Sequence, residues 1–205
     1  MADSDVTIAL DAMGGDYGPE TVIPGASMAL KERPGVSFLI FGQQKKIQPA
    51  LDKYPALKKQ SECHHTDQVI SNTDKPSTAL RHGRKSSMRL AINAVASGDA
   101  HGIVSSGNTG ALMAMAKMGM KALPQIHRPA IASVFPTMKG QTVVLDLGAN
   151  IQVDAETLAQ FAVLGSVYAR VVTGIEAPTV GILNVGSEEM KGHDRVRGAA
   201  NILSQ

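Results

Sequence analysis

The chain has 205 residues, 43% hydrophobic and 19% charged, which is the size and composition of a globular protein with one large core or two small ones. A formal net charge of +2, the lack of Trp and the presence of only three Tyr and four Phe argue against nucleic-acid binding. The single cysteine, Cys63, excludes an intrachain disulfide and a metal site with several thiolates.

The beginning of the chain carries no visible targeting signal. MADSD is acidic and leads directly into a predicted strand, unlike the basic and apolar start of a signal peptide. No apolar run approaches the roughly 20 residues that a membrane-spanning helix needs. We therefore expect a cytoplasmic protein.

Short apolar runs, rich in β-branched residues, are typical of buried strands. They predict strands at 6–10, 36–41, 102–106, 142–147 and 179–185, with a further strand at 130–135. Cys63 is interpreted as a small apolar filler rather than a nucleophile, because its neighbour His64 would point to the opposite face of a strand.

Apolar residues at helical spacing separate these runs. They predict helices over 77–97, 109–122 and 154–173, and residues 194–205 have the pattern of a helix that simply stops. The 109–122 segment is apolar almost all round, so we expect an interior helix. The alternation predicts a single α/β region over 1–205, with a mostly parallel sheet covered on both faces and a fold left incomplete at its C-terminus.

Ligands of open parallel sheets bind beyond the C-terminal ends of the strands. Four predicted strands end in turns rich in Gly and small polar residues, at 11–16, 105–110, 146–150 and 184–192. Glycine allows close backbone approach to a ligand, and the polar residues supply uncharged donors. Carboxylates in these turns could hold a metal, but hydrogen bonds from backbone N–H groups explain them more simply, and we expect no metal and no cofactor.

The segment GIVSSGNTGAL, residues 102–112, joins a predicted strand to a predicted helix. Its glycines have the spacing of the G-x-x-x-x-G-K-[ST] loop, but Asn108 replaces the Lys, which argues against NTP hydrolysis. No G-x-G-x-x-G follows a predicted strand, which argues against a dinucleotide dehydrogenase. A helix N-terminus with free N–H groups suits a smaller anion such as inorganic phosphate. Alternatively, Asn108 or Thr109 only caps the helix.

Basic side chains near these turns could face an anion. Lys191 follows a predicted strand end between acidic residues, and Arg81 and Lys85 are one helical turn apart. No Asp or Glu occurs between Ala100 and Leu145, which favours an anionic ligand or an acidic partner. For each of these basic residues, a solvated surface position is the alternative.

Several motifs together resemble one known family. KPSTALR (75–81) is one of them, and the others are IALDAMGGDYGPE (8–20), SSGNTGALMA (105–114), RPAIASVFPT (128–137), VVLDLGAN (143–150) and LNVGSEEMKG (183–192). In order and without large gaps, they resemble PlsX, the phosphate acyltransferase family of bacterial phospholipid synthesis.

The resemblance implies a three-layer α/β/α fold related to isocitrate dehydrogenases and phosphotransacetylases. It also implies an enzyme that transfers a long acyl chain from acyl carrier protein to inorganic phosphate, giving the acyl phosphate that a membrane acyltransferase uses. Because a thioester is already activated, neutral donors and one or two cations suffice for this reaction. Family members are homodimers that associate peripherally with the inner membrane face, and they continue well past position 205.

The resemblance also implies roles for individual residues. Phosphate is expected near Ser106, Gly107, Asn108 and Thr109, with Lys191 facing phosphate or the developing oxyanion. Lys191, Asn108 and Asn150 are the expected catalytic residues. The other expected substrate-binding residues form the neighbouring walls: Asp11, Gly14, Gly15, Asp16, Arg81, Asp146, Gly148, Asn184 and Glu188.

Three other functions stay open. A phosphotransacetylase shares the chemistry but depends on CoA rather than on a carrier protein. A non-catalytic anion-binding module would bind phosphate without cleaving a thioester. A decarboxylating dehydrogenase of related fold would bind NAD.

Overall fold

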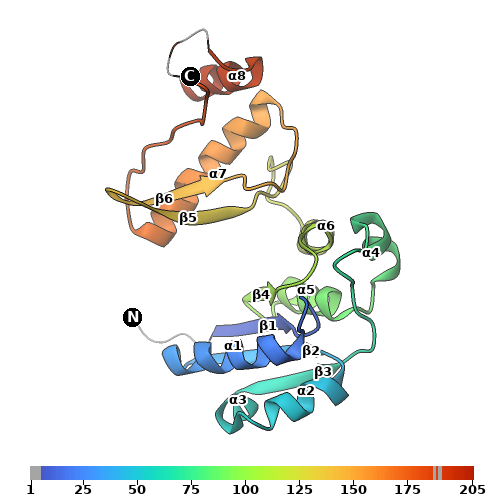
Figure 1. Ribbon diagram of the computed structural model, residues 1–205. Helices are drawn as coiled ribbons and strands as arrows, with labels where there is room; N and C mark the ends of the chain where they lie inside the picture. Colours follow the sequence, from blue (N-terminus) through green and yellow to red (C-terminus); the bar gives the residue numbers. More distant parts are fainter. Residues whose placement is uncertain (1–5, 187, 189–190) are drawn as a thin grey trace. The chain divides into compact units, whose positions relative to one another are not determined.

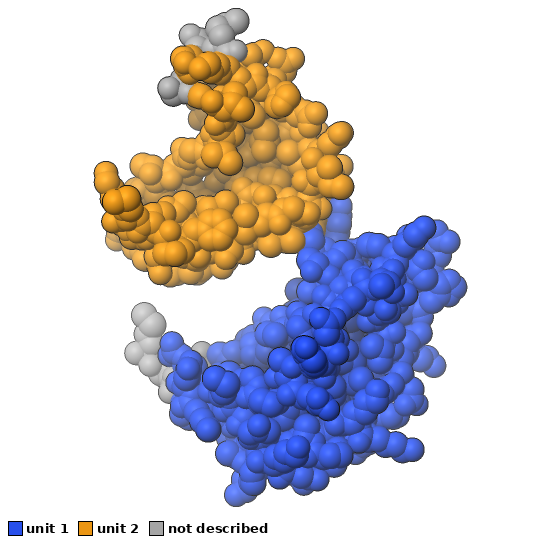
Figure 2. Space-filling view, viewed as in Figure 1, with its two compact units in different colours: residues 1–121 blue, residues 122–205 orange. Residues whose placement is uncertain are grey.

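The computed structural model describes residues 6–186, 188 and 191–205. The chain forms two compact units, residues 1–121 and 122–205, shown in blue and orange in Figure 2. The single α/β region expected over 1–205 stays a prediction. Among the described residues, no helix is both long enough and apolar enough to cross a membrane.

Unit 1 is built on a four-stranded parallel sheet with the strand order β3-β2-β1-β4. The strands are β1 (Val6–Asp11), β2 (Val36–Gly42), β3 (Ser61–His65) and β4 (Gly102–Ser105). Three of them lie where apolar runs predict strands. The edge strand β3 reads SECHH and has no such run, so hydropathy alone does not reveal it.

Alternation along the strands divides the core of unit 1 between two faces of the sheet. Leu10 and Ile40 belong to one cluster together with residues of α1 (Pro19–Glu32), α2 (Gln44–Leu51) and α3 (Pro55–Lys59). Ala9 and Phe41 point the other way and pack with residues of α5 (Ser87–Ser97). The two sets of helices cover opposite faces of the sheet (Figure 1).

Cys63 packs at the edge of the core on the α1–α3 side, and burial raises the pKa of its thiol. A raised pKa lowers the fraction of thiolate, so the side chain is not activated as a nucleophile. His64 lies on the opposite face, where its ring stacks on Phe41 with the centroids 4.8 Å apart. The interpretation of Cys63 as an apolar filler is confirmed.

The helix predicted over 77–97 is two helices, α4 (Pro76–His82) and α5. Gly83 ends α4, and Ser86 begins α5 by accepting a hydrogen bond from the Arg89 backbone N–H at 3.2 Å. The Ser86 hydroxyl also donates to the Gly83 carbonyl at 2.7 Å. A helix-ending Gly and a capping Ser three residues apart therefore outweigh the continuous apolar pattern.

Helix α6 (Thr109–Met120) packs against α4 and α5 through a cluster that includes Met88, Ile92 and Met115. Only Ala111 and Met115 of this helix are buried, and the Met118 side chain is exposed. The expectation of a helix enclosed on all sides is therefore wrong.

Unit 2 contains an antiparallel pair of strands, β5 (Ala132–Thr137) and β6 (Gly140–Leu145), and the helices α7 (Ala155–Thr173) and α8 (Asp194–Leu203). Helix α7 packs on β6 and on α8. The two-residue connection 138–139 makes a tight hairpin, so the strand predicted at 142–147 pairs antiparallel to its neighbour. The strand predicted at 179–185 is wrong, because no described strand supplies backbone partners to this segment.

Candidate functional site

The ends of β1 and β4 bring Asp11 and Ser105 together. These two residues are register partners in the parallel pair, and alternation puts both on the α5 face with Ala9 and Ile103. The Ser105 hydroxyl donates to Asp11 Oδ2 at 2.7 Å. Asp11 is only 2% exposed, so its carboxylate lies inside the unit rather than at the surface.

A second hydroxyl reaches the same carboxylate from α5. Ser87, at the first position of that helix and 1% exposed, donates to Asp11 Oδ1 at 2.6 Å. The Met13 backbone N–H also donates to Asp11 Oδ1, at 3.3 Å. Asp11 thus accepts from three neutral donors, which is how a buried carboxylate without a cation is stabilised.

Glycines allow the backbones of the turns after β1 and β4 to approach each other closely. A Cβ on Gly14 would lie 2.7 Å from Gly107 N and 2.9 Å from Asp11 Oδ2. A Cβ on Gly15, whose φ is +80°, would lie 2.7 Å from the Ser106 hydroxyl oxygen. That hydroxyl donates to the Gly14 carbonyl at 3.1 Å. Only glycine fits at these two positions without a shift of the 105–107 turn.

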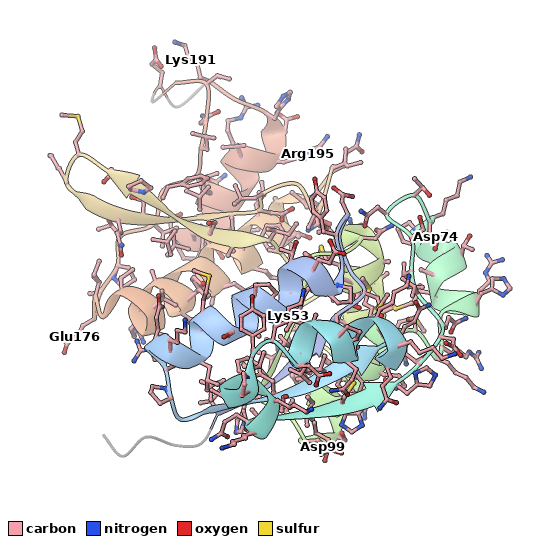
Figure 3. All side chains as sticks on the ribbon, turned by 60° about the horizontal axis from the view of Figure 1, so that its bottom comes forward. Lys53, Asp74, Asp99, Glu176, Lys191 and Arg195 are labelled. Atoms are coloured by element: carbon pink, nitrogen blue, oxygen red, sulfur yellow. The ribbon has the colours of Figure 1, made fainter. Side chains whose placement is uncertain are left out.

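Asn108 holds the start of α6 in place. Its Oδ1 accepts from the Ala111 N–H at 3.0 Å, so the interpretation of Asn108 as a helix cap is confirmed. Its Nδ2 lies 2.8–3.1 Å from three carbonyl oxygens of the preceding loop, those of Ser71, Asn72 and Asp74 (Asp74 is labelled in Figure 3). The side chain is therefore occupied by structural contacts, and its catalytic role stays a prediction.

The N-terminus of α6 presents the donors that an anion needs. Among the described residues, no acceptor binds the backbone N–H of Thr109 or of Gly110. Thr109 is exposed and its hydroxyl lies in the same first turn. The dipole of this 12-residue helix adds positive potential at the same place. This end of unit 1 is suited to a small anion.

Two further predicted residues of unit 1 are exposed. Asp16 is exposed and accepts from the Asn72 side-chain amide at 3.0 Å, which ties the loop after β1 to the loop held by Asn108. Arg81 is exposed in the last turn of α4, the helix that packs against α6.

In unit 2, the turn after β6 is closed on itself by Asp146. Its carboxylate accepts from the backbone N–H of Ile131, Ala149 and Asn150 at 2.8, 3.2 and 2.7 Å, and from the Asn150 amide at 3.1 Å. Partial burial acts to raise the pKa of Asp146, but these hydrogen bonds outweigh it, and the pKa lies below its ordinary value. Gly148 provides the positive φ, +99°, that this turn uses.

Lys191 forms a separate group with Glu188 and Asn184. Its ammonium lies 2.6 Å from Glu188 Oε1, and its carbonyl accepts from the Asn184 amide at 3.0 Å. Both charged side chains are more than half exposed, and Lys191 is labelled in Figure 3. The neighbouring positions 187, 189 and 190 of this predicted turn lie outside the described residues. An acidic neighbour for Lys191 is confirmed in Glu188.

Unit 2 also has a cavity of about 360 Å³ that the sequence does not predict. Arg128 and Arg195 line it, and their guanidinium groups donate to the carbonyls of Gln152 and Val153 at 3.4 and 3.3 Å. Asp154 lies in the same wall and caps α7. These contacts and the acidic neighbour offset the two cations. Among the described residues, no three His, Cys, Asp or Glu gather as a metal site would require.

The chain is similar to known proteins over nearly its whole length. The family described as Fatty acid synthesis protein matches residues 6–205. Relatives named Phosphate acyltransferase from Rhodospirillum centenum and Parvibaculum lavamentivorans are 59% and 54% identical, over 96% and 98% of this chain. The chain belongs to the phosphate acyltransferase (PlsX) family. It spans about half the length of these curated relatives, 55% and 56%.

A solved structure agrees with this assignment at the level of the fold. A phosphotransacetylase from Streptococcus pyogenes matches with a TM-score of 0.71, over 98% of this chain and 64% of that one, at 19% identity. The predicted α/β fold class, related to phosphotransacetylases, is confirmed.

In this member of the phosphate acyltransferase family, the predicted site residues other than Arg81 form three groups. The first, in unit 1, joins the turns after β1 and β4; the second surrounds Asp146 and Asn150; the third is Asn184, Glu188 and Lys191. Sequence reasoning missed Ser87, since its partner is 76 residues away. The paired serines at 86–87, which start a helix just after a glycine, were the one available signal.

Proposed function

We propose that this chain carries the phosphate-binding part of a phosphate acyltransferase that takes its acyl group from acyl carrier protein. The observation that carries the proposal is the first turn of α6, where the N–H groups of Thr109 and Gly110 and the Thr109 hydroxyl are available at the end of a parallel sheet. Family membership supplies the reaction class, since the relatives are named for acyl transfer to phosphate.

The proposed reaction is a direct transfer. A phosphate oxygen attacks the thioester carbonyl carbon, a new C–O bond forms, and the C–S bond breaks. The products are acyl phosphate and the carrier-protein thiolate, which takes a proton from solvent. Positioned neutral donors and a cation for the oxyanion are sufficient, because the thioester needs no further activation.

Lys191 is proposed as that cation, and Asn150 as a further donor. The ion pair of Lys191 with Glu188 holds the ammonium without burying it, since both side chains are more than half exposed. Acyl carrier protein as the donor, a homodimer and peripheral membrane association are proposed from the family.

The test is the release of free thiol from long-chain acyl carrier protein, with and without inorganic phosphate. Phosphate-dependent release that is lost in Lys191→Ala and retained in Lys45→Ala, an exposed lysine of α2, is the expected result. Release from acetyl-CoA instead would favour a phosphotransacetylase. Phosphate binding without release from either donor would favour a non-catalytic module, and NAD binding a dehydrogenase; either result would contradict the proposal.

A further inference from the structure

Ser87 is a buried polar residue that the proposed reaction does not use. It is the first residue of α5 and is 1% exposed. Its hydroxyl donates a hydrogen bond to Asp11 Oδ1 at 2.6 Å. Its backbone N–H donates to the Gln68 carbonyl at 3.1 Å. Ser87 therefore connects the start of α5 to the end of β1, beneath the turn where phosphate is proposed to bind.

We infer that Ser87 and Asp11 are positioning residues of the phosphate site, which act on the Ser105–Gly107 turn through the Ser105 hydroxyl and touch no substrate. This inference rests on the proposed function. It changes the role expected for Asp11 from the sequence, where the residue stands among those that bind substrate.

The direction of the hydrogen bonds around Asp11 fixes the orientation of the Ser105 hydroxyl. An ionised carboxylate only accepts, so Ser87 and Ser105 must each donate their one proton to Asp11. With its proton committed at 2.7 Å, the Ser105 oxygen presents a lone pair, and this lone pair accepts the Gly107 N–H at 3.1 Å. The carboxylate thus fixes the orientation of the peptide group that precedes α6.

Asp11 itself is badly suited to contact phosphate. It is 2% exposed, both carboxylate oxygens already accept hydrogen bonds, and its negative charge would repel an anion. Its charge is useful only because it makes two neutral hydroxyls point inward. Ser87 has the further effect of holding α5 to the strand end, and α5 packs against α6.

The network makes a sharp prediction for Asp11→Asn. An amide has one acceptor oxygen and one donor nitrogen, so it cannot accept from both serines. At one serine, the amide nitrogen must therefore donate where the carboxylate accepted. If that serine is Ser105, its oxygen takes the amide proton, its own proton turns away from residue 11, and the hydroxyl leaves the orientation in which it accepts the Gly107 N–H at 3.1 Å. We then expect the 105–107 turn to shift.

The experiment compares Ser87→Ala, Asp11→Asn and Ser105→Ala with Ser27→Ala, a buried serine of α1 outside this network. Two quantities are measured on the ¹⁵N-labelled chain: the Gly107 amide resonance and the dissociation constant of inorganic phosphate. We expect the three network variants to shift the Gly107 resonance and weaken phosphate binding about tenfold, as loss of about one hydrogen bond would. Ser27→Ala should change neither.

The two proposals fail in different ways. If the wild-type chain binds no phosphate, the proposed function fails, but the Gly107 resonance still reports whether Ser87 and Asp11 position the turn. Unchanged Gly107 resonance and phosphate affinity in the network variants would overturn the inference. Where a variant does not fold, slow hydrogen exchange of the wild-type Gly107 amide supports the bond to Ser105, and rapid exchange contradicts it.

Discussion

Asp11 and Ser105 end neighbouring parallel strands opposite each other, and the Ser105 hydroxyl donates to the Asp11 carboxylate at 2.7 Å. These residues are 94 positions apart in the chain. Their contact joins the turn after β1 to the turn after β4 as one structure. A substitution in either turn should therefore change the structure of the other turn.

Gly14→Ala tests this contact directly. The new Cβ would lie 2.7 Å from Gly107 N, too close for any real contact, so we expect a loss of stability of about 1–3 kcal/mol and weaker phosphate binding. Gly25→Ala is the matched control, because a Cβ there meets nothing within 4 Å and the position is inside α1. The control should gain about 0.5–1 kcal/mol. Urea unfolding measures both, and equal effects would contradict the contact.

Asn108→Ala should destabilise unit 1 by about 2 kcal/mol, because it removes a helix cap and the donor to three loop carbonyls. The loop at 71–75 should also become more sensitive to a protease. Asn93→Ala removes an exposed asparagine side chain of α5 whose oxygen accepts from the Arg89 guanidinium, and should cost less than about 0.5 kcal/mol. A similar loss of stability in both variants would mean that Asn108 does not hold the loop.

Asp146 should make unit 2 less stable in acid. Its folded-state pKa is lowered from the ordinary value of 3.8, so its stabilising effect is complete above that value and is lost as the pH falls through the folded pKa. Carbon-13 NMR of the Asp146 carboxyl in the folded chain should therefore give a pKa below 3.8. In Asp146→Asn, the backbone donors of Ile131 and Asn150 lose their charged acceptor, and stability at neutral pH should fall. A pKa at or above the ordinary value would contradict the turn geometry.

The predictable parts of the fold are those where local pattern and tertiary structure agree. Strands β1, β2 and β4 are apolar runs. Helix α7 has apolar residues at regular helical spacing, and Asp154 caps its N-terminus. The 179–185 run has the same local pattern but no partner strand among the described residues. Hydropathy does not encode a partner, so this error could not be avoided from the sequence alone.

In the candidate site, too, the features set by local sequence are predictable and those that depend on tertiary contacts are not. Ser106, Gly107, Asn108 and Thr109 are predictable, because a Gly-rich turn between a strand and a helix marks a helix N-terminus. Ser87 is not predictable, because its importance comes from a single bond to Asp11 across 76 residues. The burial of Asp11 is not predictable either, because an Asp is seldom buried without partners and its partners Ser87 and Ser105 are distant in the sequence.

A titration of the ¹⁵N-labelled chain with inorganic phosphate, followed by NMR, tests the proposed phosphate site most directly. We expect saturable shifts that are largest for the backbone amides of Thr109 and Gly110 and extend to Ser106 and Gly107. Chloride at equal ionic strength should leave these amides unchanged. Saturable shifts centred elsewhere, or none at these amides in the folded chain, would contradict the placement of the phosphate site at the start of α6.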